Sequence, residues 1–256
     1  MLTFKRTKNT FWILTVVLLV LNWLAGISLW WSIGVLAFFL LMCTIGSFVA
    51  GLQFFLPAIT KGKMNSGTVA ITFDDGPVYG KTNEILEILR QHNVPATFFC
   101  IGSRIVRESG TIQKIHAEGH LIGNHSYSHR PGFGFFSTEK VRRELADTDR
   151  AIEGLIGNSP RFFRPPFGVT NPMIAKATKG SYTVVGWSIR SFDTVIRNPQ
   201  RLLKRVSHTV ESGDIILFHD YSDAMLKILP QCITEIKNKG LKIVRLDVLL
   251  NQQGYR

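Results

Sequence analysis

Acidic residues are absent from the start of this chain, where Asp74 is the first carboxylate. Charge of either sign is absent from residues 9–60, a run of 52 residues that also lacks histidine. The apolar core of a secretory signal is only about 7–15 residues long, so this run is too long for one. Cysteine is scarce as well. Three cysteines without paired spacing exclude a disulfide framework and a thiolate metal site.

The apolar run is long enough for two membrane-spanning helices of about 20 residues each. We place these transmembrane helices at about 11–27 and 33–52, with a turn near Gly26. Trp30 and Trp31 follow the turn, at the headgroup level that tryptophan prefers. The chain is therefore predicted to be an integral membrane protein with an N-terminal hairpin (1–60) and a second domain (61–256). Basic residues flank both ends of the hairpin, which indicates that both ends face the cytoplasm.

The formal net charge is +12, and the 27 basic and 18 acidic residues from Lys61 onward give +9. An excess of this sign suits an anionic partner, such as lipid headgroups or an acidic envelope polymer, although it also serves general solubility. No basic helix and no basic–aromatic motif of a nucleic-acid module is visible in the sequence. We therefore expect a lipid bilayer as a partner and no nucleic acid.

Residues beyond 68 alternate between short β-rich runs and helical patterns with one apolar face, and Thr82 is a plausible N-cap of the first helix. About seven such units predict an α/β fold with a parallel sheet, closed as a barrel or left open. The polar clusters all follow strands, and those strand ends form the active-site face of parallel barrels. The expected strands are 69–73, 96–101, 121–123, 161–163, 182–185, 215–218 and 242–244.

Five clusters carry the chemistry: TFDDGP at 72–77, HSYSH at 125–129, RPPFG at 164–168, WSIRSFD at 187–193 and LFHD at 217–220. Singly most of them are common patterns. Together and in this order they resemble the polysaccharide deacetylase family, the NodB-like carbohydrate esterases, over about residues 69–246. The resemblance implies a distorted (β/α) barrel, a divalent metal that is most often zinc, and hydrolysis of the acetamide of an N-acetylated sugar.

The histidine pair fits a metal site on its own chemistry. His125 and His129 are four residues apart, so that both imidazoles can reach one ion from a helical turn or tight loop. Asp75 supplies an oxygen ligand. Three protein ligands leave one position for water, which is typical of catalytic rather than structural zinc. We therefore expect Asp75, His125 and His129 to bind the metal.

Asp74 fits the general base that takes a proton from the metal-activated water. Arg164 resembles the arginine that orients this base in the family, a task suited to a forked guanidinium. The family stabilises the oxyanion with a backbone N–H at the position of Phe167, where it commonly has tyrosine. Because this contribution comes from the main chain, phenylalanine should leave it intact.

His219 matches the general acid of the family, and Asp193 matches the acidic residue that keeps this histidine protonated. Leu217 lies on the same strand face as His219 and is expected to help form a small acetate pocket. Trp187 is expected to contact the substrate as well. The family often has an aspartate directly after this tryptophan, where the chain has Ser188. That departure concerns the tuning of the site and not the reaction class.

These residues predict a membrane-anchored, metal-dependent deacetylase of N-acetylated glycans. A second hypothesis is a deacylase or deformylase of a lipid-linked aminosugar, and a third is a sugar-binding protein without activity. The third would be marked by loss of a metal ligand, the base or the acid, and none is lost. The basic flanks favour a cytoplasmic domain, whereas the usual substrates of the family lie in the envelope, so the side of the membrane stays open.

Overall fold

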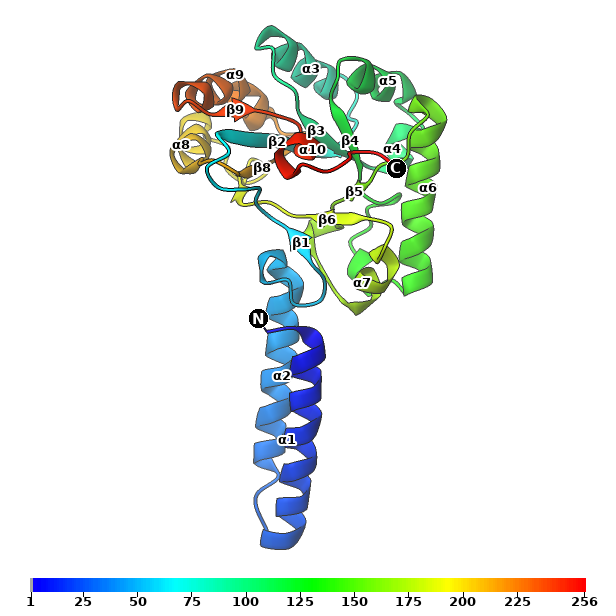
Figure 1. Ribbon diagram of the computed structural model, residues 1–256, viewed down its shortest axis with the longest axis vertical. Coiled ribbons are helices and arrows are strands. Elements are labelled where there is room, and N and C mark those ends of the chain that lie inside the picture. Colours follow the sequence, from blue (N-terminus) through cyan, green and yellow to red (C-terminus); the bar gives the residue numbers. More distant parts are fainter. Residues whose placement is uncertain (1) are drawn as a thin grey trace.

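The computed structural model describes residues 2–256. A long helical hairpin projects from one end of a wider α/β domain (Figure 1). The hairpin consists of α1 (Phe4–Ala25) and α2 (Trp30–Phe48). The domain contains the strands β1 (Ala58–Ile59), β2 (Thr68–Gly76), β3 (Thr97–Cys100), β4 (Leu121–Asn124), β5 (Phe162–Phe163), β6 (Thr183–Val185), β7 (Ile189–Arg190), β8 (Ile215–His219) and β9 (Lys242–Ile243). Its helices are α3 (Lys81–Gln91), α4 (Gly102–Ile105), α5 (Ser109–Ala117), α6 (Thr138–Ile156), α7 (Pro172–Thr178), α8 (Pro199–Thr209), α9 (Asp223–Asn238) and α10 (Leu246–Leu250).

The sheet is parallel and curls without closing, in the order β1-β6-β5-β4-β3-β2-β8-β7, with β9 paired to the start of β2. The two end strands of this order, β1 and β7, are not paired to each other. The long central strand β2 is buried along nearly its whole length, because helices cover one face and the barrel interior fills the other. The predicted α/β fold, a distorted (β/α) barrel, is confirmed.

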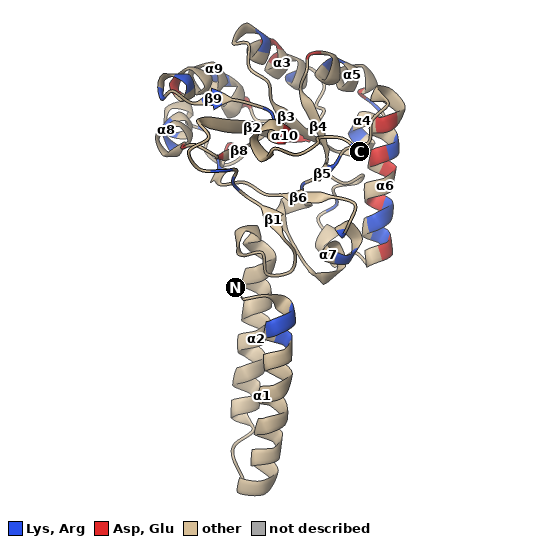
Figure 2. Cartoon of the chain, viewed as in Figure 1, with Lys and Arg blue, Asp and Glu red and all other residues tan. Residues whose placement is uncertain are grey.

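The hairpin is apolar on its outside and joined tightly to the domain. None of the residues of α1 is buried, and Gly46 alone is buried in α2. Figure 2 shows that charge is confined to the basic residues of α1 beside the domain. At the end of α2, the backbone N–H of Thr170 donates to the carbonyl of Ser47 at 2.9 Å, and its Oγ1 donates to the carbonyl of Gly46 at 3.1 Å. The hairpin is therefore fixed to the segment that follows β5.

The helices differ in their bounds from the two predicted spans. α1 begins at Phe4, before its basic residues, because lysine and arginine are good helix formers and need not end a helix where the apolar run ends. α2 ends at Phe48, where the chain turns through a short 3₁₀ segment (Ala50–Leu52) toward the domain. The expected turn near Gly26 is present, with Gly26 in the left-handed conformation at the end of α1.

The predicted cap at Thr82 is wrong. α3 begins at Lys81 with Gly80 as its N-cap, so Thr82 already lies inside the helix. Its hydroxyl instead donates to Oδ2 of buried Asp220 at 2.6 Å and accepts from the N–H of Val78 at 2.8 Å. Thr82 thus ties the start of α3 to the end of β8.

Candidate active site

The predicted site residues meet at the carboxyl ends of the strands, around one cavity of about 210 Å³. β2, β4 and β8 end there, and parallel strands bring such ends to the same edge of a sheet. Eight of the ten residues line the cavity: Asp74, Asp75, His125, His129, Phe167, Trp187, Leu217 and His219. The other two, Arg164 and Asp193, lie behind them and bond to members of this set.

Asp75, His125 and His129 form what we call the ligand triangle, in which three ligand atoms lie within 4.8 Å of one another. Asp75 Oδ1 is 3.4 Å from Nε2 of His125 and 3.2 Å from Nε2 of His129. The same oxygen is buried and has no hydrogen-bond partner among the described residues. A buried acceptor without a partner is costly, and two imidazoles with one carboxylate are a common donor set for a divalent metal. The triangle therefore fits a metal ion.

The tautomer of His125 and the pKa shifts of Asp75 and His129 agree with this fit. Burial alone would lower the pKa of His125, but the carboxylates of Asp74 and Asp75, which a bound cation would share, raise it above its usual value. His125 Nδ1 lies 2.7 Å from the carbonyl of Arg164, which can only accept, so a neutral ring has its proton there and its lone pair on Nε2. Burial alone would raise the pKa of Asp75, but the two imidazoles lower it below its usual value. Burial, together with the nearby His125, lowers the pKa of His129 to about 4. An ionised carboxylate and a neutral imidazole are the forms that bind metals.

Asp74 is held in one orientation by Arg164, whose side chain is fully buried. Arg164 Nη1 donates to Asp74 Oδ1 at 2.7 Å and to Thr72 Oγ1 at 2.8 Å, and Nη2 donates to the carbonyl of Gly186 at 2.8 Å. The guanidinium carbon lies 4.2 Å from the ring centroid of Phe99. Packing and three donated bonds leave this arginine, and with it the carboxylate, little freedom to move.

His219 pairs with Asp193 at the end of β8, where its register partner on β2 is Asp74. His219 Nδ1 is 2.8 Å from Asp193 Oδ1, and the backbone N–H of His219 donates to Oδ2 at 2.9 Å. Burial alone would lower the pKa of His219, but the hydrogen bond and charge of Asp193 raise it above the usual value. The paired ring is therefore biased toward its protonated form, with Nε2 as the nitrogen left for the cavity.

Apolar side chains form the wall between these groups. Leu217 is buried, two residues before His219 on β8. The Trp187 indole packs over Gly168, where an added Cβ would lie 2.4 Å from Trp187 Cη2. Phe167 is 53% exposed, and its ring centroid lies 4.8 Å from that of His129. An acyl group that enters the cavity would meet this wall beside the ligand triangle.

Backbone strain gathers at the same place. Among residues 2–256, nine non-glycine residues have positive φ, and five of them lie in the polar clusters: Asp75, Ser126, His129, Phe167 and Phe192. Such conformations cost about 1–3 kcal/mol each and persist only where the surrounding structure holds them. The strain marks this edge of the sheet as the part of the domain built for binding or chemistry.

Four residues that line the cavity were not among the predicted site residues: Gly168, Arg190, Thr194 and Tyr221. Arg190 lies within the cluster 187–193, but no periodicity showed that its side chain turns toward the site. Tyr221 follows His219 and Asp220, and its ring centroid is 5.7 Å from the His219 ring. Position within a cluster was the available signal for Arg190, whereas Tyr221 lies one residue beyond the cluster 217–220.

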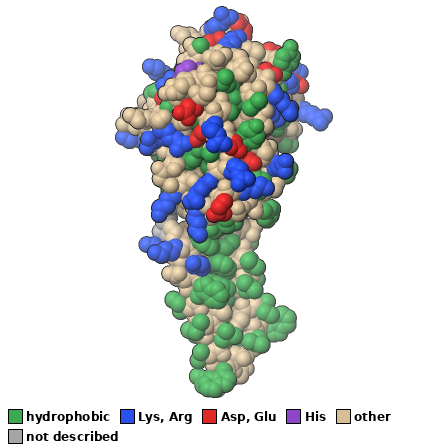
Figure 3. Space-filling view, turned by 90° about the vertical axis from the view of Figure 1, so that its right-hand side faces the viewer, with side chains coloured by type: hydrophobic (Ala, Val, Ile, Leu, Met, Phe, Trp, Pro, Cys, Tyr) green, Lys and Arg blue, Asp and Glu red, His purple; other side chains and the backbone are tan. Residues whose placement is uncertain are grey.

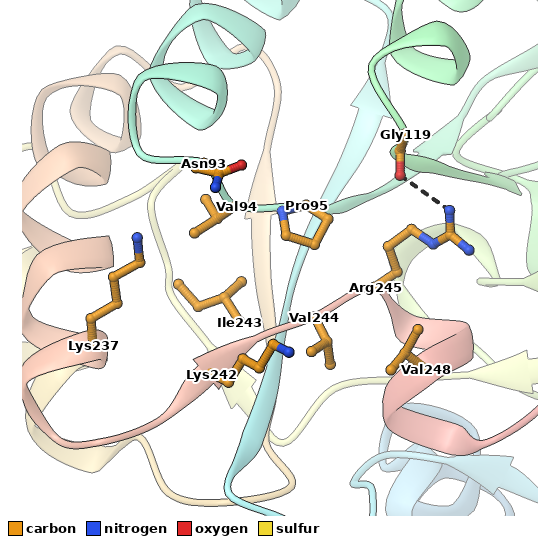
Figure 4. Close-up of a pocket in the computed structure, with 10 residues that line it drawn as sticks. All are labelled: Asn93, Val94, Pro95, Gly119, Lys237, Lys242, Ile243, Val244, Arg245 and Val248. Carbon is orange, nitrogen blue, oxygen red and sulfur yellow. Dashed lines mark hydrogen bonds between the residues drawn. The ribbon is translucent and has the colours of Figure 1, made fainter.

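A larger hollow of about 480 Å³ lies at the other end of the strands (Figure 4). Its lining contains no carboxylate and no imidazole. Two of its cations already have structural partners, since Lys237 Nζ donates to the carbonyl of His92 at 2.6 Å and Arg245 Nη1 to that of Gly119 at 3.1 Å. Size alone therefore does not mark this hollow as a reaction site.

Comparison with known proteins agrees with the arrangement of the site. The sequence profile of the polysaccharide deacetylase family matches residues 61–185. A peptidoglycan-N-acetylglucosamine deacetylase of Bacillus cereus is 34% identical over 204 residues, which cover 76% of this chain and 72% of that protein. A protein of the same description from Listeria monocytogenes is 32% identical over 77% of this chain, but the chain spans only 42% of its length.

Solved structures show the same fold. The Bc1960 peptidoglycan N-acetylglucosamine deacetylase has a TM-score of 0.74 and 31% identity, with 78% of this chain and 95% of that chain covered. Wild-type BA3943 of Bacillus anthracis, described as a CE4 family pseudoenzyme, has a TM-score of 0.72 and 28% identity over 78% of this chain and 71% of that chain. The fold thus occurs with and without activity, and activity depends on the residues of the site. With its matching profile and its one-third identity to most of the Bacillus cereus protein, this chain belongs to the polysaccharide deacetylase family.

Proposed function

We propose that the chain is a metal-dependent hydrolase that removes N-acetyl groups from an N-acetylated glycan. The observation that carries this proposal is the meeting of three units at one cavity: the ligand triangle, the Asp74–Arg164 pair and the His219–Asp193 pair. The descriptions of the relatives as peptidoglycan deacetylases support it.

The ligand triangle is proposed to hold a divalent cation, with zinc as the ion that best suits two imidazoles and a carboxylate. Bound there, a divalent cation lowers the pKa of water from about 15.7 to about 7 and polarises a carbonyl oxygen. The chain's own residues then have two tasks, which are to move protons and to place the acetyl group.

Asp74 accepts the proton of the attacking water, as that oxygen forms its bond to the acetyl carbon. Its Oδ1 is held by Arg164 at 2.7 Å, whereas Oδ2 lies 3.8 Å from His125 Nε2, at the edge of the ligand triangle. Oδ2 is therefore the oxygen left to take a proton. Leu217, Trp187 and the backbone of Phe167 surround the acetyl group in this proposal.

His219 donates a proton to the sugar nitrogen as the carbon–nitrogen bond breaks. Asp193 occupies Nδ1, so Nε2 is the donor, and the raised pKa of the ring keeps that proton available near neutral pH. One water is consumed, and the products are acetate and a free amine. The two proton carriers lie on neighbouring strands, since Asp74 and His219 are register partners on β2 and β8.

Acetate release by the full-length protein tests this function. We expect zinc-loaded protein to release acetate from an N-acetylglucosamine tetrasaccharide, and Asp74→Asn to keep its zinc but lose about 10²–10⁴-fold in turnover. Asp147→Asn is a matched control, because Asp147 lies on α6 and pairs with Arg150 in solvent. Zinc-loaded wild-type protein that releases no acetate from any N-acetylated sugar would refute the proposal.

We also propose that α1 and α2 anchor the protein in a membrane. They have 22 and 19 residues, and both meet the length and hydropathy of spanning helices. Figure 3 shows hydrophobic side chains over the outside of the hairpin and basic side chains on the domain next to it. An apolar surface of this extent is unfavourable in water. Two paired helices of spanning length favour an anchor that crosses the membrane twice, and they argue against a signal peptide that is cleaved off.

Impermeant thiol labelling tests this topology. Cysteines are placed at Ser28 and Ser66 in turn, in protein whose three native cysteines are replaced, and a hairpin requires the two sites on opposite sides. Labelling of Ser66 from outside supports an external glycan as substrate, and labelling of Ser28 from outside supports a lipid-linked aminosugar in the cytoplasm. The second substrate is favoured by the bonds between the end of α2 and Thr170, close to the cavity. Labelling of both sites from one side would refute the hairpin.

A further inference from the structure

Arg190 lies on β7 and lines the catalytic cavity with an exposed side chain. Its guanidinium carbon is 5.8 Å from the ring centroid of Trp187 and 4.8 Å from that of Phe192. Within residues 2–256, no carboxylate lies within ion-pair distance of this guanidinium, and its side chain donates no hydrogen bond. Arg190 is thus a cation at the cavity that is held by aromatic rings and not neutralised by the protein.

The carboxylates of the site are already engaged. Asp74 is paired with Arg164 at 2.7 Å, and Asp193 with His219 at 2.8 Å. Asp75 belongs to the ligand triangle, 3.2 Å and 3.4 Å from its imidazoles. Arg190 also lines a separate hollow with Glu211 and Asp214, but these carboxylates pair with Lys61. Inside the catalytic cavity, an anion that pairs with Arg190 would therefore come from the substrate.

One surface next to the cavity is also positively charged, like Arg190. A second hollow shares Thr194 and Tyr221 with the cavity and is also lined by Arg197 and Lys227. The exposed carboxylate there, Asp223, is neutralised by Lys81 at 2.5 Å. An anionic group on a sugar that extends out of the cavity would meet cations on this side.

On the basis of the proposed function, we infer that Arg190 is a specificity-determining residue that selects an N-acetylated sugar with an anionic substituent, a carboxylate or a phosphate. The planar guanidinium presents two parallel N–H donors, which match either oxygen pair. The rings of Trp187 and Phe192 restrict the guanidinium before substrate arrives, so less freedom is lost on binding. A neutral glycan reacts in the same cavity without this contact.

The test compares three probes with full-length, zinc-loaded protein in detergent. The neutral probe is an N-acetylglucosamine tetrasaccharide, the carboxylate probe is a tetrasaccharide that alternates with N-acetylmuramic acid, and the phosphate probe is N-acetylglucosamine diphosphate on a short prenyl chain. The readout is the ratio of kcat/KM on each anionic probe to kcat/KM on the neutral probe. We expect Arg190→Gln to lower this ratio by about 10–100-fold, as loss of a charge-assisted contact does, and Arg190→Lys to retain part of it.

Arg205→Gln is the matched control. Arg205 contacts the same Phe192 ring at 4.5 Å and donates to the Arg190 carbonyl at 3.1 Å, but it does not line the catalytic cavity. We expect its ratio to stay at the wild-type value. High salt should lower the wild-type ratio, because exposed charges are screened.

The possible outcomes distinguish the two anionic ligands and separate this inference from the proposed function. A fall for the carboxylate probe alone identifies a sugar acid as the ligand, and a fall for the diphosphate probe alone identifies a lipid-linked phosphate. Equal losses on all three probes in Arg190→Gln would overturn the inference and leave deacetylation standing. Wild-type protein that acts on none of the probes would overturn the proposed function itself.

Discussion

Replacing Asp193 by asparagine tests whether this carboxylate controls the proton of His219. Asp193 is buried, and its Oδ1 lies 2.8 Å from His219 Nδ1 and accepts from Ser191 Oγ at 2.8 Å. Asparagine keeps the shape and one acceptor oxygen but removes the negative charge. The protonated ring then loses its counter-charge, while the burial that opposes protonation remains.

The size of the effect follows from the lost charge. A hydrogen bond to a charged group contributes about 1.5–3 kcal/mol, and a neutral one about 1 kcal/mol. The difference of about 1–2 kcal/mol corresponds to a fall of about one pH unit in the pKa of His219. In the wild type the folded-state pKa is raised, so the pair stabilises the fold below about pH 6.5 and this contribution is lost as pH rises through the folded-state value.

The assay is kcat/KM as a function of pH, with an NMR titration of His219 in the zinc-loaded protein. Because the general acid acts in its protonated form, the alkaline limb should move to lower pH by about one unit in Asp193→Asn. Ser191→Ala is the control, because it removes the hydrogen bond that Ser191 Oγ donates to Asp193 but keeps the charge of Asp193. Its alkaline limb should shift much less than that of Asp193→Asn. A limb that stays in place while the pKa of His219 falls would show that His219 is not the acid.

Three further substitutions test other parts of the site. Asp75→Asn should lower the zinc content of purified protein without a comparable loss of metal-free stability, and a fully loaded variant would contradict its place in the ligand triangle. Arg164→Met should destabilise the fold by about 3–5 kcal/mol in urea, because buried Asp74 loses its cation; a loss below about 1 kcal/mol would refute that argument. Gly168→Ala places a Cβ 2.4 Å from Trp187 Cη2 at a φ of +68°. The KM should therefore rise, and the free energy of unfolding should fall by about 1–3 kcal/mol. Wild-type values of both quantities would contradict this packing argument.

Much of the fold could be predicted because its long elements have a clear period. Strand β2 and helix α6 show their β-rich run and apolar stripe directly in the sequence. β1 and β7 were not predicted, because β1 lies at the end of the long apolar run and β7 inside a polar cluster, and neither stands out as a β-rich run of its own. They form by pairing with β6 and β8. The predicted cap at Thr82 failed because a buried tertiary partner, Asp220, takes its hydroxyl.

The candidate site could be predicted as a set, because polar clusters that follow parallel strands must meet at one edge. The structure brings all ten predicted residues together, while their catalytic roles stay predictions. What the sequence could not supply is the direction of exposed side chains such as Arg190 and Tyr221. The Arg190 guanidinium lies against the rings of Trp187 and Phe192, and the Tyr221 ring lies near that of His219. No periodicity in the sequence shows these contacts.

The two hydrogen bonds from Thr170 to the end of α2 have a consequence for where the protein can work. A catalytic domain on a flexible linker explores a volume that grows with the length of the linker. This domain has no such freedom, since the chain between α2 and β1 is short and Phe54 within it packs on Gly46. In a bilayer the cavity would stand at a constant height and in a constant orientation above the lipid. The protein would then modify glycan in one thin layer beside the membrane, and strands farther out would escape it however long they remained in place.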